Sequence, residues 1–221
     1  MAHREQFEFI QHVQSLFPER FTSQRVLEVG SLDINGSVRS FFTNCDYIGI
    51  DIAEGKGVDI VCEGQRYDAP DASFDMVISC EAMEHNPFWK ETLDNMIRLV
   101  RPGGLVVMTC ATLGREEHGT AASEPSSSPL TVEKGWNYYR NLTPSDLKEV
   151  PGLKLLAGWG HASNWDSFDL YFVGIKTPAQ NDSLDRLNKL FSFYRKRFWT
   201  TLKWIRRAPR KYLIHMFFGK K

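Results

Sequence analysis

Residues 25–51 read RVLEVGSLDINGSVRSFFTNCDYIGID, and this stretch decides the fold. Its apolar start, VLEV, favours a strand that is buried on both faces. Gly30 ends that strand at a point where backbone can approach a ligand closely. A second apolar run, YIGI, ends at Asp51, where a carboxylate can accept hydrogen bonds from both ribose hydroxyls of a nucleoside. The stretch therefore predicts a strand–helix–strand unit with a ligand site at its open end.

The turn between these two strands carries residues suited to a helix start. Asn35-Gly36 tolerates positive φ, and Ser37 can cap a short helix that contains Phe41-Phe42. Free amides in the first turn of that helix would face a polar group. The pattern argues against a nicotinamide dinucleotide, because G-x-G-x-x-G would need glycine at Leu32 and Asn35.

Residues 24–110 resemble the class I S-adenosylmethionine-dependent methyltransferases, in particular the bacterial subgroup called type 11. In that family one acid opens the glycine turn, a second ends the next strand and a third follows the third strand, and Glu28, Asp51 and Glu63 occupy these points. The string LVRPGGLVVM is also typical of the family. The later glycines of its usual acid-x-Gly-x-Gly-x-Gly loop are replaced here by leucine and isoleucine.

The resemblance implies an α/β fold: a Rossmann-like, doubly wound, seven-stranded sheet, mostly parallel with an antiparallel last strand. It implies S-adenosyl-L-methionine as cofactor. The implied cofactor-binding residues are Glu28, Gly30, Ser31, Asn35, Gly36, Asp51, Ile52, Glu63, Gly64 and Cys80. In the family, an acid at the position of Glu63 accepts from the adenine amino group, and the next backbone amide donates to the ring. A solvated loop acid is the alternative for Glu63.

Hydrophobic periodicity and turn signals place the other elements. Apolar residues at helical spacing predict a helix over residues 4–17, ended by Pro18. Thr143 followed by Pro144 predicts the start of a further helix. The remaining expected elements are strands at 58–61, 74–80, 105–110, 154–158 and 168–175 and a helix at 87–100.

Three segments follow from this assignment. Residues 1–178 form the expected methyltransferase domain, and within it residues 112–143 leave the carboxyl end of a central strand and are placed to cover the ligand crevice. Residues 181–221 form a basic, amphipathic helical tail. An apolar stripe from Leu187 to Ile205 runs along that tail.

Charge divides the chain at the same place. The formal net charge is zero, but residues 181–221 hold 12 Lys+Arg and 2 Asp+Glu of the 27 and 27 in the chain, so the tail carries +10 and the body −10. Such a helix fits an anionic membrane surface, or docking onto an acidic domain or a protein partner. Nucleic acid is the third alternative and is not the expected partner.

Compartment is predicted from what the sequence lacks. No apolar stretch approaches the roughly 18 residues of a membrane span, and the start MAHREQFEFIQ is charged where a signal peptide is apolar. The spacings of the four cysteines fit neither a paired zinc motif nor a disulfide framework, so we expect reduced, mostly buried thiols. These features predict a cytoplasmic protein, with the tail as a peripheral contact at the inner membrane surface.

The string E-x-x-E-H at Glu81, Glu84 and His85 directly follows a strand and faces the crevice. It resembles the metal-binding string of ubiquinone-pathway O-methyltransferases and small-RNA 2′-O-methyltransferases. Two carboxylates and an imidazole suit a divalent cation. Proton handling by His85 and a structural capping role are the alternatives, and we assign no metal ligand.

Three residues of the covering segment are further candidates. His118 can act as a base because its pKa lies near neutrality, and plain solvation is the alternative. Tyr139 and Arg140 can bind an anionic or sugar acceptor, Arg140 through its planar guanidinium. A surface salt bridge is an equal alternative for Arg140.

Together these features predict an S-adenosylmethionine-dependent methyltransferase that acts on a hydroxyl of a small-molecule or glycan acceptor. His118 and His85 are the expected catalytic residues. The alternative is a catalytically idle nucleoside-binding module that acts through its basic tail with a membrane or protein partner.

Overall fold

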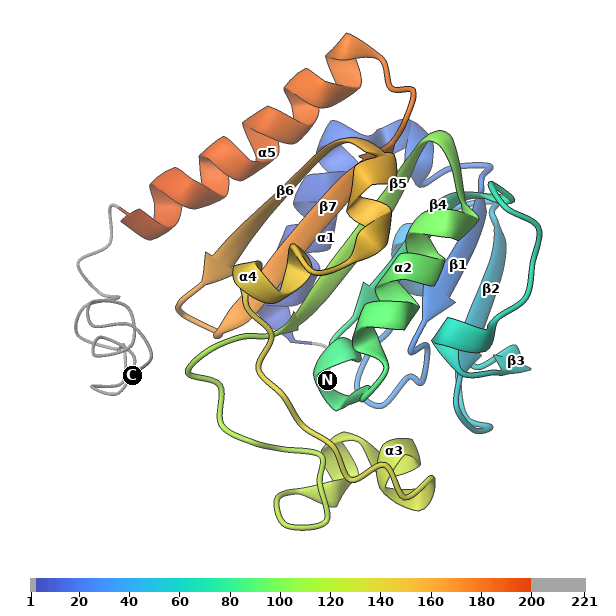
Figure 1. Ribbon diagram of the computed structural model, residues 1–221, viewed down its shortest axis with the longest axis vertical. Coiled ribbons are helices and arrows are strands. Elements are labelled where there is room, and N and C mark those ends of the chain that lie inside the picture. The colour runs from blue at the N-terminus through green and yellow to red at the C-terminus, as the bar shows by residue number, and fades with distance from the viewer. Residues whose placement is uncertain (1–2, 200–221) are drawn as a thin grey trace.

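A computed structural model describes residues 3–199 of the 221-residue chain (Figure 1). Its helices are α1 (Arg4–Leu16), α2 (Trp89–Leu99), α3 (Pro129–Glu133), α4 (Pro144–Leu147) and α5 (Asn181–Trp199). Its strands are β1 (Arg25–Val29), β2 (Asp46–Asp51), β3 (Ile60–Val61), β4 (Phe74–Cys80), β5 (Val100–Ala111), β6 (Leu156–Asn164) and β7 (Asp169–Lys176).

Over the described residues the strands form one seven-stranded sheet in the order β3-β2-β1-β4-β5-β7-β6. Strands β1 to β5 are parallel, while β7 runs antiparallel between β5 and β6. The stretch that decided the fold lies at the centre, since Leu27 of β1 pairs with Ile48 on one side and Val77 on the other. The expected Rossmann-like sheet with an antiparallel last strand is confirmed.

Helices cover both faces of this sheet (Figure 1). Alternate strand residues point to opposite faces, so Val26 and Met76 pack with α1 and α5, whereas Leu27 and Val77 pack with α2 and α4. The first face buries Phe9, Ile10 and Val13 of α1, and the second buries Leu93, Met96 and Ile97 of α2. The sheet is therefore a doubly wound layer with a hydrophobic core on each side.

Four expected elements differ from the structure. Strand β5 begins at Val100, five residues before the expected start. Ser37 caps as predicted by accepting from the amide of Arg39, but the element it starts is a single 3₁₀ turn, Val38–Phe41. Strand β3 has two residues instead of four, because it pairs only with β2 at the exposed edge of the sheet. Strand β6 begins later than expected, because Pro151–Leu155 forms a 3₁₀ turn.

The tail helix is a layer of the fold over its described part. Leu187, Leu190, Phe191 and Tyr194 of α5 are buried in the same core cluster as α1. The hydrophobic core therefore does not end at Ile175, as the sequence had led us to expect. The described part of the tail, helix α5, packs onto the domain. Leu202 and Ile205 of the predicted stripe lie outside the described residues.

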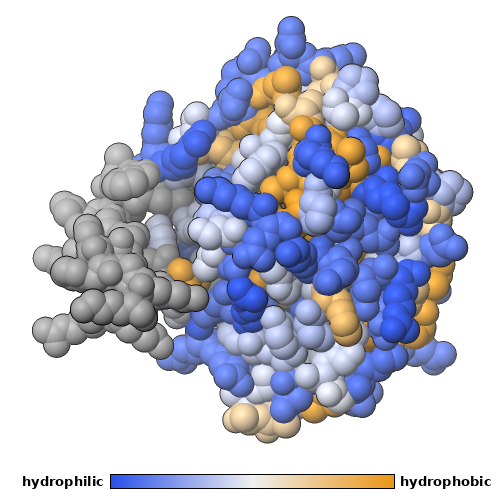
Figure 2. Space-filling view, in the orientation of Figure 1, coloured by the Kyte–Doolittle hydropathy of each residue, from blue (hydrophilic) through white to orange (hydrophobic). Residues whose placement is uncertain are grey.

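The surface seen in Figure 2 is mostly hydrophilic, with hydrophobic residues in small patches. Among residues 3–199, no helix is long and apolar enough to cross a membrane. All four cysteines are free; Cys110 is fully buried, and Cys45, Cys62 and Cys80 are partly buried.

Candidate functional site

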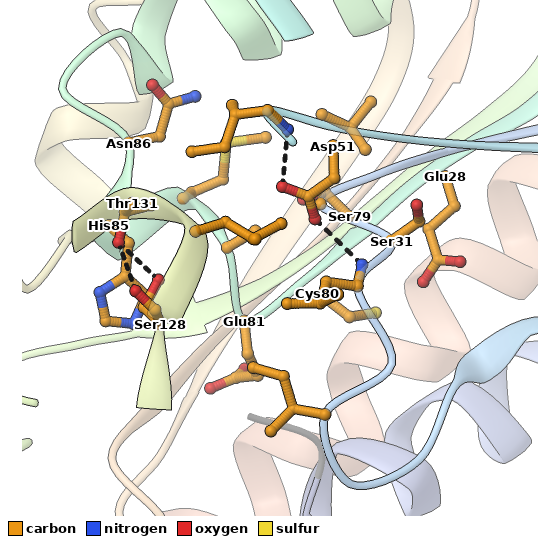
Figure 3. Close-up of a pocket in the computed structure, with 18 of the residues that line it drawn as sticks. Glu28, Ser31, Asp51, Ser79, Cys80, Glu81, His85, Asn86, Ser128 and Thr131 are labelled. Atoms are coloured by element: carbon orange, nitrogen blue, oxygen red, sulfur yellow. Dashed lines mark hydrogen bonds between the residues drawn. The ribbon is translucent and has the colours of Figure 1, made fainter. Parts of the chain in front are cut away.

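A pocket of about 950 Å³, including space open to solvent, lies at the carboxyl ends of the parallel strands (Figure 3). Successive strand ends each contribute to its wall: Gly64 after β3, Asp51 at the end of β2, Gly30 after β1 and Glu81 after β4. Ligands of open α/β sheets bind in this position, outside the carboxyl ends of the strands. Nine of the ten residues expected to bind the cofactor line the pocket, namely Glu28, Gly30, Ser31, Asn35, Gly36, Asp51, Ile52, Gly64 and Cys80.

Asp51 is held in place by backbone donors from two segments. Its Oδ2 accepts from the amide of Leu32 at 3.0 Å, and its Oδ1 accepts from the amide of Ile52 at 2.8 Å. Burial raises the pKa of Asp51, while these two amides act in the opposite direction. An ionised carboxylate offers about four acceptor positions, so roughly two remain for a ligand after the backbone bonds are made.

Gly30 brings the turn close to the segment after β4. It has φ +80°, and a Cβ at this position would lie 2.4 Å from Cβ of Ala82. A side chain here would therefore push two walls of the pocket apart.

Glu28, in the strand before this turn, is 4% exposed and accepts from the Tyr47 hydroxyl at 2.8 Å. Burial raises the pKa of Glu28 to about 7, although Tyr47 opposes the shift. The expected opening acid of the glycine turn is therefore a buried carboxyl group that is partly protonated near neutral pH.

Glu63 is the one expected cofactor residue outside the pocket lining. Its carboxylate pairs with Arg66 at 3.2 Å and lies 3.8 Å from Nζ of Lys134, which follows α3. The adjacent Gly64 is buried and lines the pocket. The role of Glu63 toward adenine stays a prediction, while its pairs connect the β3 end to the covering segment.

The covering segment forms one wall of the pocket. Residues 127–131 and Trp136 line it, and Figure 1 shows α3 lying beyond the edge of the sheet. The sequence placed this segment over the crevice but named none of these residues. Gln6 of α1 also lines the pocket and was missed; its signal was a polar residue on the same helical stripe as Phe9, Ile10 and Val13.

The E-x-x-E-H string is divided between two groups. Glu81 lies with His3 and Asp169, whereas Glu84 and His85 lie with His118. Within each group the possible ligand atoms are within 4.8 Å of one another. The three residues of the string are therefore divided between two groups and do not converge on one site.

His85 is the only one of the two catalytic candidates that lines the pocket. Burial, followed by the neighbouring His118, lowers the pKa of His85 to about 3, so its imidazole is neutral near pH 7. His118 lies behind it, with ring centroids 4.9 Å apart, and its Nδ1 is 3.0 Å from the carbonyl of Glu116. The structure thus places His118 in contact with His85 and not at the pocket wall.

The two expected acceptor-binding residues also lie outside the pocket lining. Tyr139 packs against both histidine rings and donates to Asn141 at 2.9 Å. Arg140 pairs with Asp146 and has its guanidinium over the ring of Trp89. The salt-bridge alternative describes the observed contacts of Arg140.

The fold resembles solved structures of methyltransferases. One is phosphoethanolamine N-methyltransferase 2 of Haemonchus contortus, with TM-score 0.56 and 16% identity over 79% of this chain and 53% of that chain. Another is 1,6-didemethyltoxoflavin-N1-methyltransferase of Burkholderia thailandensis, with TM-score 0.52 and 15% identity over 78% of this chain and 80% of that chain. The N-methyltransferase NodS of Bradyrhizobium japonicum gives TM-score 0.51 and 12% identity over 78% and 87%. The chain thus spans about half the length of the first of these.

No curated protein matches the chain in sequence. A family model described as a methyltransferase domain matches residues 1–138, which is more than half of the chain. Together with the seven-stranded sheet and the pocket at its carboxyl edge, this match shows that the chain belongs to the methyltransferase domain family.

Proposed function

We propose that the protein transfers the methyl group of S-adenosyl-L-methionine to a hydroxyl of a small-molecule or glycan acceptor. The observation that carries the cofactor assignment is Asp51, a carboxylate fixed by two backbone amides at the end of β2 and on the wall of the pocket. A carboxylate in this position can accept from both hydroxyls of a ribose.

We infer the direction of the cofactor in the pocket from the order of the strand ends. With the ribose at Asp51, the adenine extends toward Gly64 at the β3 end, and the sulfur and amino-acid part extend toward Gly30 and Glu81. Four of the solved methyltransferase structures contain S-adenosylhomocysteine or S-adenosylmethionine with a chain of this fold. These complexes support the choice of cofactor class for the pocket.

Methyl transfer from a sulfonium is an in-line displacement, so alignment of the acceptor oxygen, methyl and sulfur supplies much of the acceleration. His85 lines the pocket and is neutral, so it can accept a hydrogen bond from an acceptor hydroxyl. A base whose pKa is about 3 removes a proton weakly at neutral pH. We therefore assign His85 to orientation of the acceptor, with His118 packed behind it.

The covering segment supports a small acceptor or the exposed hydroxyl of a glycan. Ser128, Thr131 and Trp136 close one side of the pocket with hydroxyl groups and an indole. Such a wall suits the polar and apolar surfaces of a hydroxyl-bearing ring.

The proposal is tested first by calorimetric titration of the full chain with S-adenosylmethionine and S-adenosylhomocysteine. Both ligands are expected to bind. If neither binds, the cofactor assignment is overturned. Turnover is then measured as S-adenosylhomocysteine released with panels of hydroxyl, amine and carbon acceptors. Release with amines or carbon acceptors alone would keep the enzyme class and overturn O-methylation.

A further inference from the structure

We propose that Glu84 receives the proton that the acceptor loses during methyl transfer, and that His85 passes this proton on from the pocket. The inference rests on the proposed function, because it takes S-adenosyl-L-methionine as the methyl donor and an acceptor that releases a proton. It concerns a buried acid outside the pocket lining, to which the sequence assigned no part in proton transfer.

Glu84 is a fully buried acid in the 3₁₀ turn Met83–His85, shortly after β4. It is 0% exposed, and neither carboxyl oxygen has a hydrogen-bond partner among residues 3–199. Its backbone carbonyl, by contrast, accepts from the amide of Arg140 in the covering segment at 2.8 Å. A buried carboxylate without donors is costly, so the neutral acid is the more stable form of this side chain while the pocket holds no cation.

Two imidazole rings lie beside this acid. A carboxyl oxygen of Glu84 and one ring nitrogen each of His85 and His118 all lie within 4.8 Å of one another. His85 lines the pocket, and both of its ring nitrogens lack hydrogen-bond partners among the described residues, whereas His118 is partly exposed. The three residues therefore connect the pocket wall to a side chain that solvent reaches.

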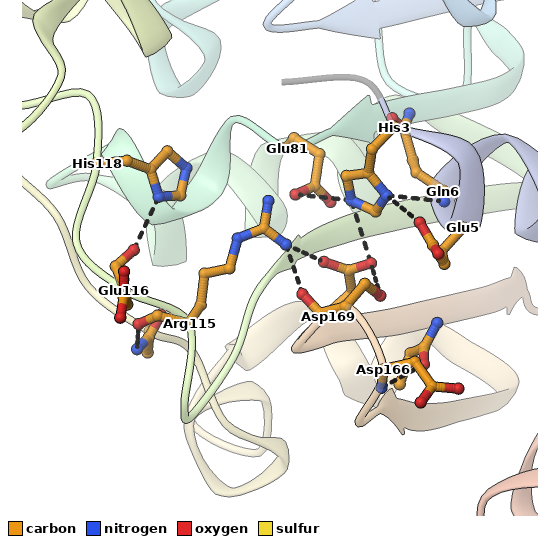
Figure 4. Close-up of polar contacts among 12 residues, drawn as sticks. His3, Glu5, Gln6, Glu81, Arg115, Glu116, His118, Asp166 and Asp169 are labelled. Atoms are coloured by element: carbon orange, nitrogen blue, oxygen red, sulfur yellow. Dashed lines mark hydrogen bonds and ion pairs between the residues drawn. The ribbon is translucent and has the colours of Figure 1, made fainter. Parts of the chain in front are cut away.

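The tautomer of His118 gives the proton of Glu84 a place to rest. Nδ1 of His118 lies 3.0 Å from the carbonyl oxygen of Glu116, which accepts, so Nδ1 carries the hydrogen (Figure 4). Nε2 is then an acceptor, and it has no partner within the described part of the chain. The hydroxyl of the neutral Glu84 side chain can donate to this nitrogen.

Burial, followed by the charge of Glu81, raises the pKa of Glu84 to about 8, while the backbone of Glu84 and Ala111 acts in the opposite direction. Burial also lowers the pKa of both histidines and raises the pKa of Cys110 and of Tyr139, so these four neighbours are neutral near pH 7. The titratable groups that face Glu84 are Glu81 and His85 of its own segment, Cys110 of β5, and His118 and Tyr139 of the covering segment.

The other acid of the string, Glu81, belongs to a charge-balanced group (Figure 4). His3 lies 3.6 Å from Glu81 and 3.2 Å from Asp169, and Arg115 lies 3.1 Å from Asp169. Burial acts to raise the pKa of Glu81, but the contact with His3 outweighs burial and lowers the pKa to about 2. Glu81 stays ionised, so Glu84 is the acid of the string whose protonation can change.

The charge of the cofactor gives Glu84 a reason to change its protonation. S-adenosylmethionine carries a sulfonium, and its product S-adenosylhomocysteine carries a neutral thioether. A nearby positive charge favours the ionised form of a carboxyl group, and solvent screens this effect little in a buried site. Glu84 is therefore ionised in the complex with S-adenosylmethionine and takes up a proton when the sulfonium charge is lost.

Atoms and charges balance in this step. The acceptor oxygen bonds to the methyl carbon, the carbon–sulfur bond breaks and its electron pair stays on sulfur. The acceptor's proton moves to the pocket-side nitrogen of His85, whose other nitrogen gives its proton to the Glu84 carboxylate, directly or through one water. The site loses one positive and one negative charge together, so His85, whose pKa is about 3, does not have to keep the proton. Ionisation of Glu84 in the next cycle returns the proton to solvent past His118.

The test counts the protons exchanged on binding. Calorimetry of the full chain at about pH 7.5, in buffers of different ionisation enthalpy, gives this number for S-adenosylmethionine and for S-adenosylhomocysteine. S-adenosylmethionine is expected to release up to about one proton more. The difference isolates the effect of the sulfonium, because the two ligands share the adenosine and the amino-acid part.

Glu84→Gln has the size of the neutral acid and cannot ionise, so it should bind both ligands with equal proton counts. Its kcat should fall about 100-fold while the KM for the acceptor stays the same. The wild-type kcat should decline as pH falls through the pKa of Glu84 in the complex, since only the ionised form accepts a proton, and the variant should lose this decline. Glu149→Gln is the matched control, because Glu149 is an exposed acid paired with Lys90 outside the pocket lining. It should keep the wild-type difference and kcat.

Glu28 is another buried acid that a cation in the pocket can ionise, because burial raises its pKa to about 7. If the proton difference survives in Glu84→Gln, Glu28 or another group carries it and the proposal is overturned. Glu28→Gln asks the same question from the other side and keeps the test available if Glu84→Gln does not fold. The difference should persist in Glu28→Gln, and its loss there would overturn the role of Glu84.

The outcomes also separate this inference from the proposed function. If neither ligand binds the wild type, the cofactor assignment fails. If both bind with equal proton counts, or if Glu84→Gln keeps the wild-type kcat, the cofactor site stands and the role of Glu84 fails. Turnover with amine acceptors alone would overturn O-methylation and leave this role in place, because an amine also loses a proton when it is methylated.

Discussion

Replacement of Asp51 tests the centre of the proposed cofactor site. In Asp51→Ala the ribose loses a charged acceptor for two hydroxyls, and each such hydrogen bond contributes about 1.5–3 kcal/mol. The two together amount to about 3–6 kcal/mol, which is a rise in Kd for S-adenosylhomocysteine of about 10²- to 10⁴-fold. The same change removes the acceptor of the Leu32 and Ile52 amides, so the free energy of unfolding should also fall by a few kcal/mol.

Calorimetric titration measures the Kd, and thermal unfolding measures the second effect. Asp51→Asn keeps one carbonyl acceptor for a backbone amide and should lose affinity with a smaller loss of stability. Asp46→Ala is the matched control, because Asp46 is an exposed acid at the opposite end of the same strand, paired with Arg25. A Kd in Asp51→Ala equal to that of Asp46→Ala would refute the ribose assignment.

Three further predictions concern residues around this site. Glu63→Ala should raise the Kd for S-adenosylhomocysteine less than Asp51→Ala does, since only one contact to adenine is removed. A larger loss of affinity in Glu63→Ala, measured by calorimetry, would contradict this order. The pKa of His3 is raised to about 10 in the fold, so its stabilisation is fully present below about pH 6.5, declines by up to about 1.4 kcal/mol per pH unit above that and is lost above about pH 10. His3→Gln should remove this slope from the free energy of urea unfolding measured across pH 6–10. Removal of residues 200–221 should leave the thermal midpoint and cofactor affinity unchanged, whereas removal of residues 181–221 should lower the midpoint because it strips Leu190 and Phe191 from the core. Residues 200–221 hold seven Lys or Arg and no acid, so their removal should also abolish salt-sensitive binding to anionic vesicles. If the full chain does not bind such vesicles, the tail is expected to bind a protein partner instead.

The local sequence was sufficient for the strands buried at the centre. An apolar run such as VLEV or FDMVISC has few alternatives to a strand in a parallel sheet, and β1 and β4 fall where they were expected. Capping is also local, because a cap joins residues two or three positions apart; Ser37 and Thr143 both cap as predicted. The resemblance to the methyltransferase family then gave nine lining residues of the pocket.

Edge elements were less predictable, since their pairing depends on neighbours that the local pattern does not contain. Val58 and Asp59 have strand-like neighbours but remain outside β3, which has only β2 to pair with. The basic tail shows the same limit. Its stripe fits a membrane surface and a protein face equally, and only the tertiary structure shows that α5 packs beside α1.

The side-chain chemistry at the pocket was decided by long-range contacts. Glu81 and Glu84 are three residues apart in one string, yet Glu81 meets His3 from the start of α1 and Asp169 from β7, while Glu84 meets His118 from the covering segment. The sequence by itself determined the sheet, the acid at the end of β2 that lines the pocket and the segment that covers it. The partners of each charged group came from the tertiary structure, because a buried charge is stabilised by whichever segment the fold brings within a few ångströms.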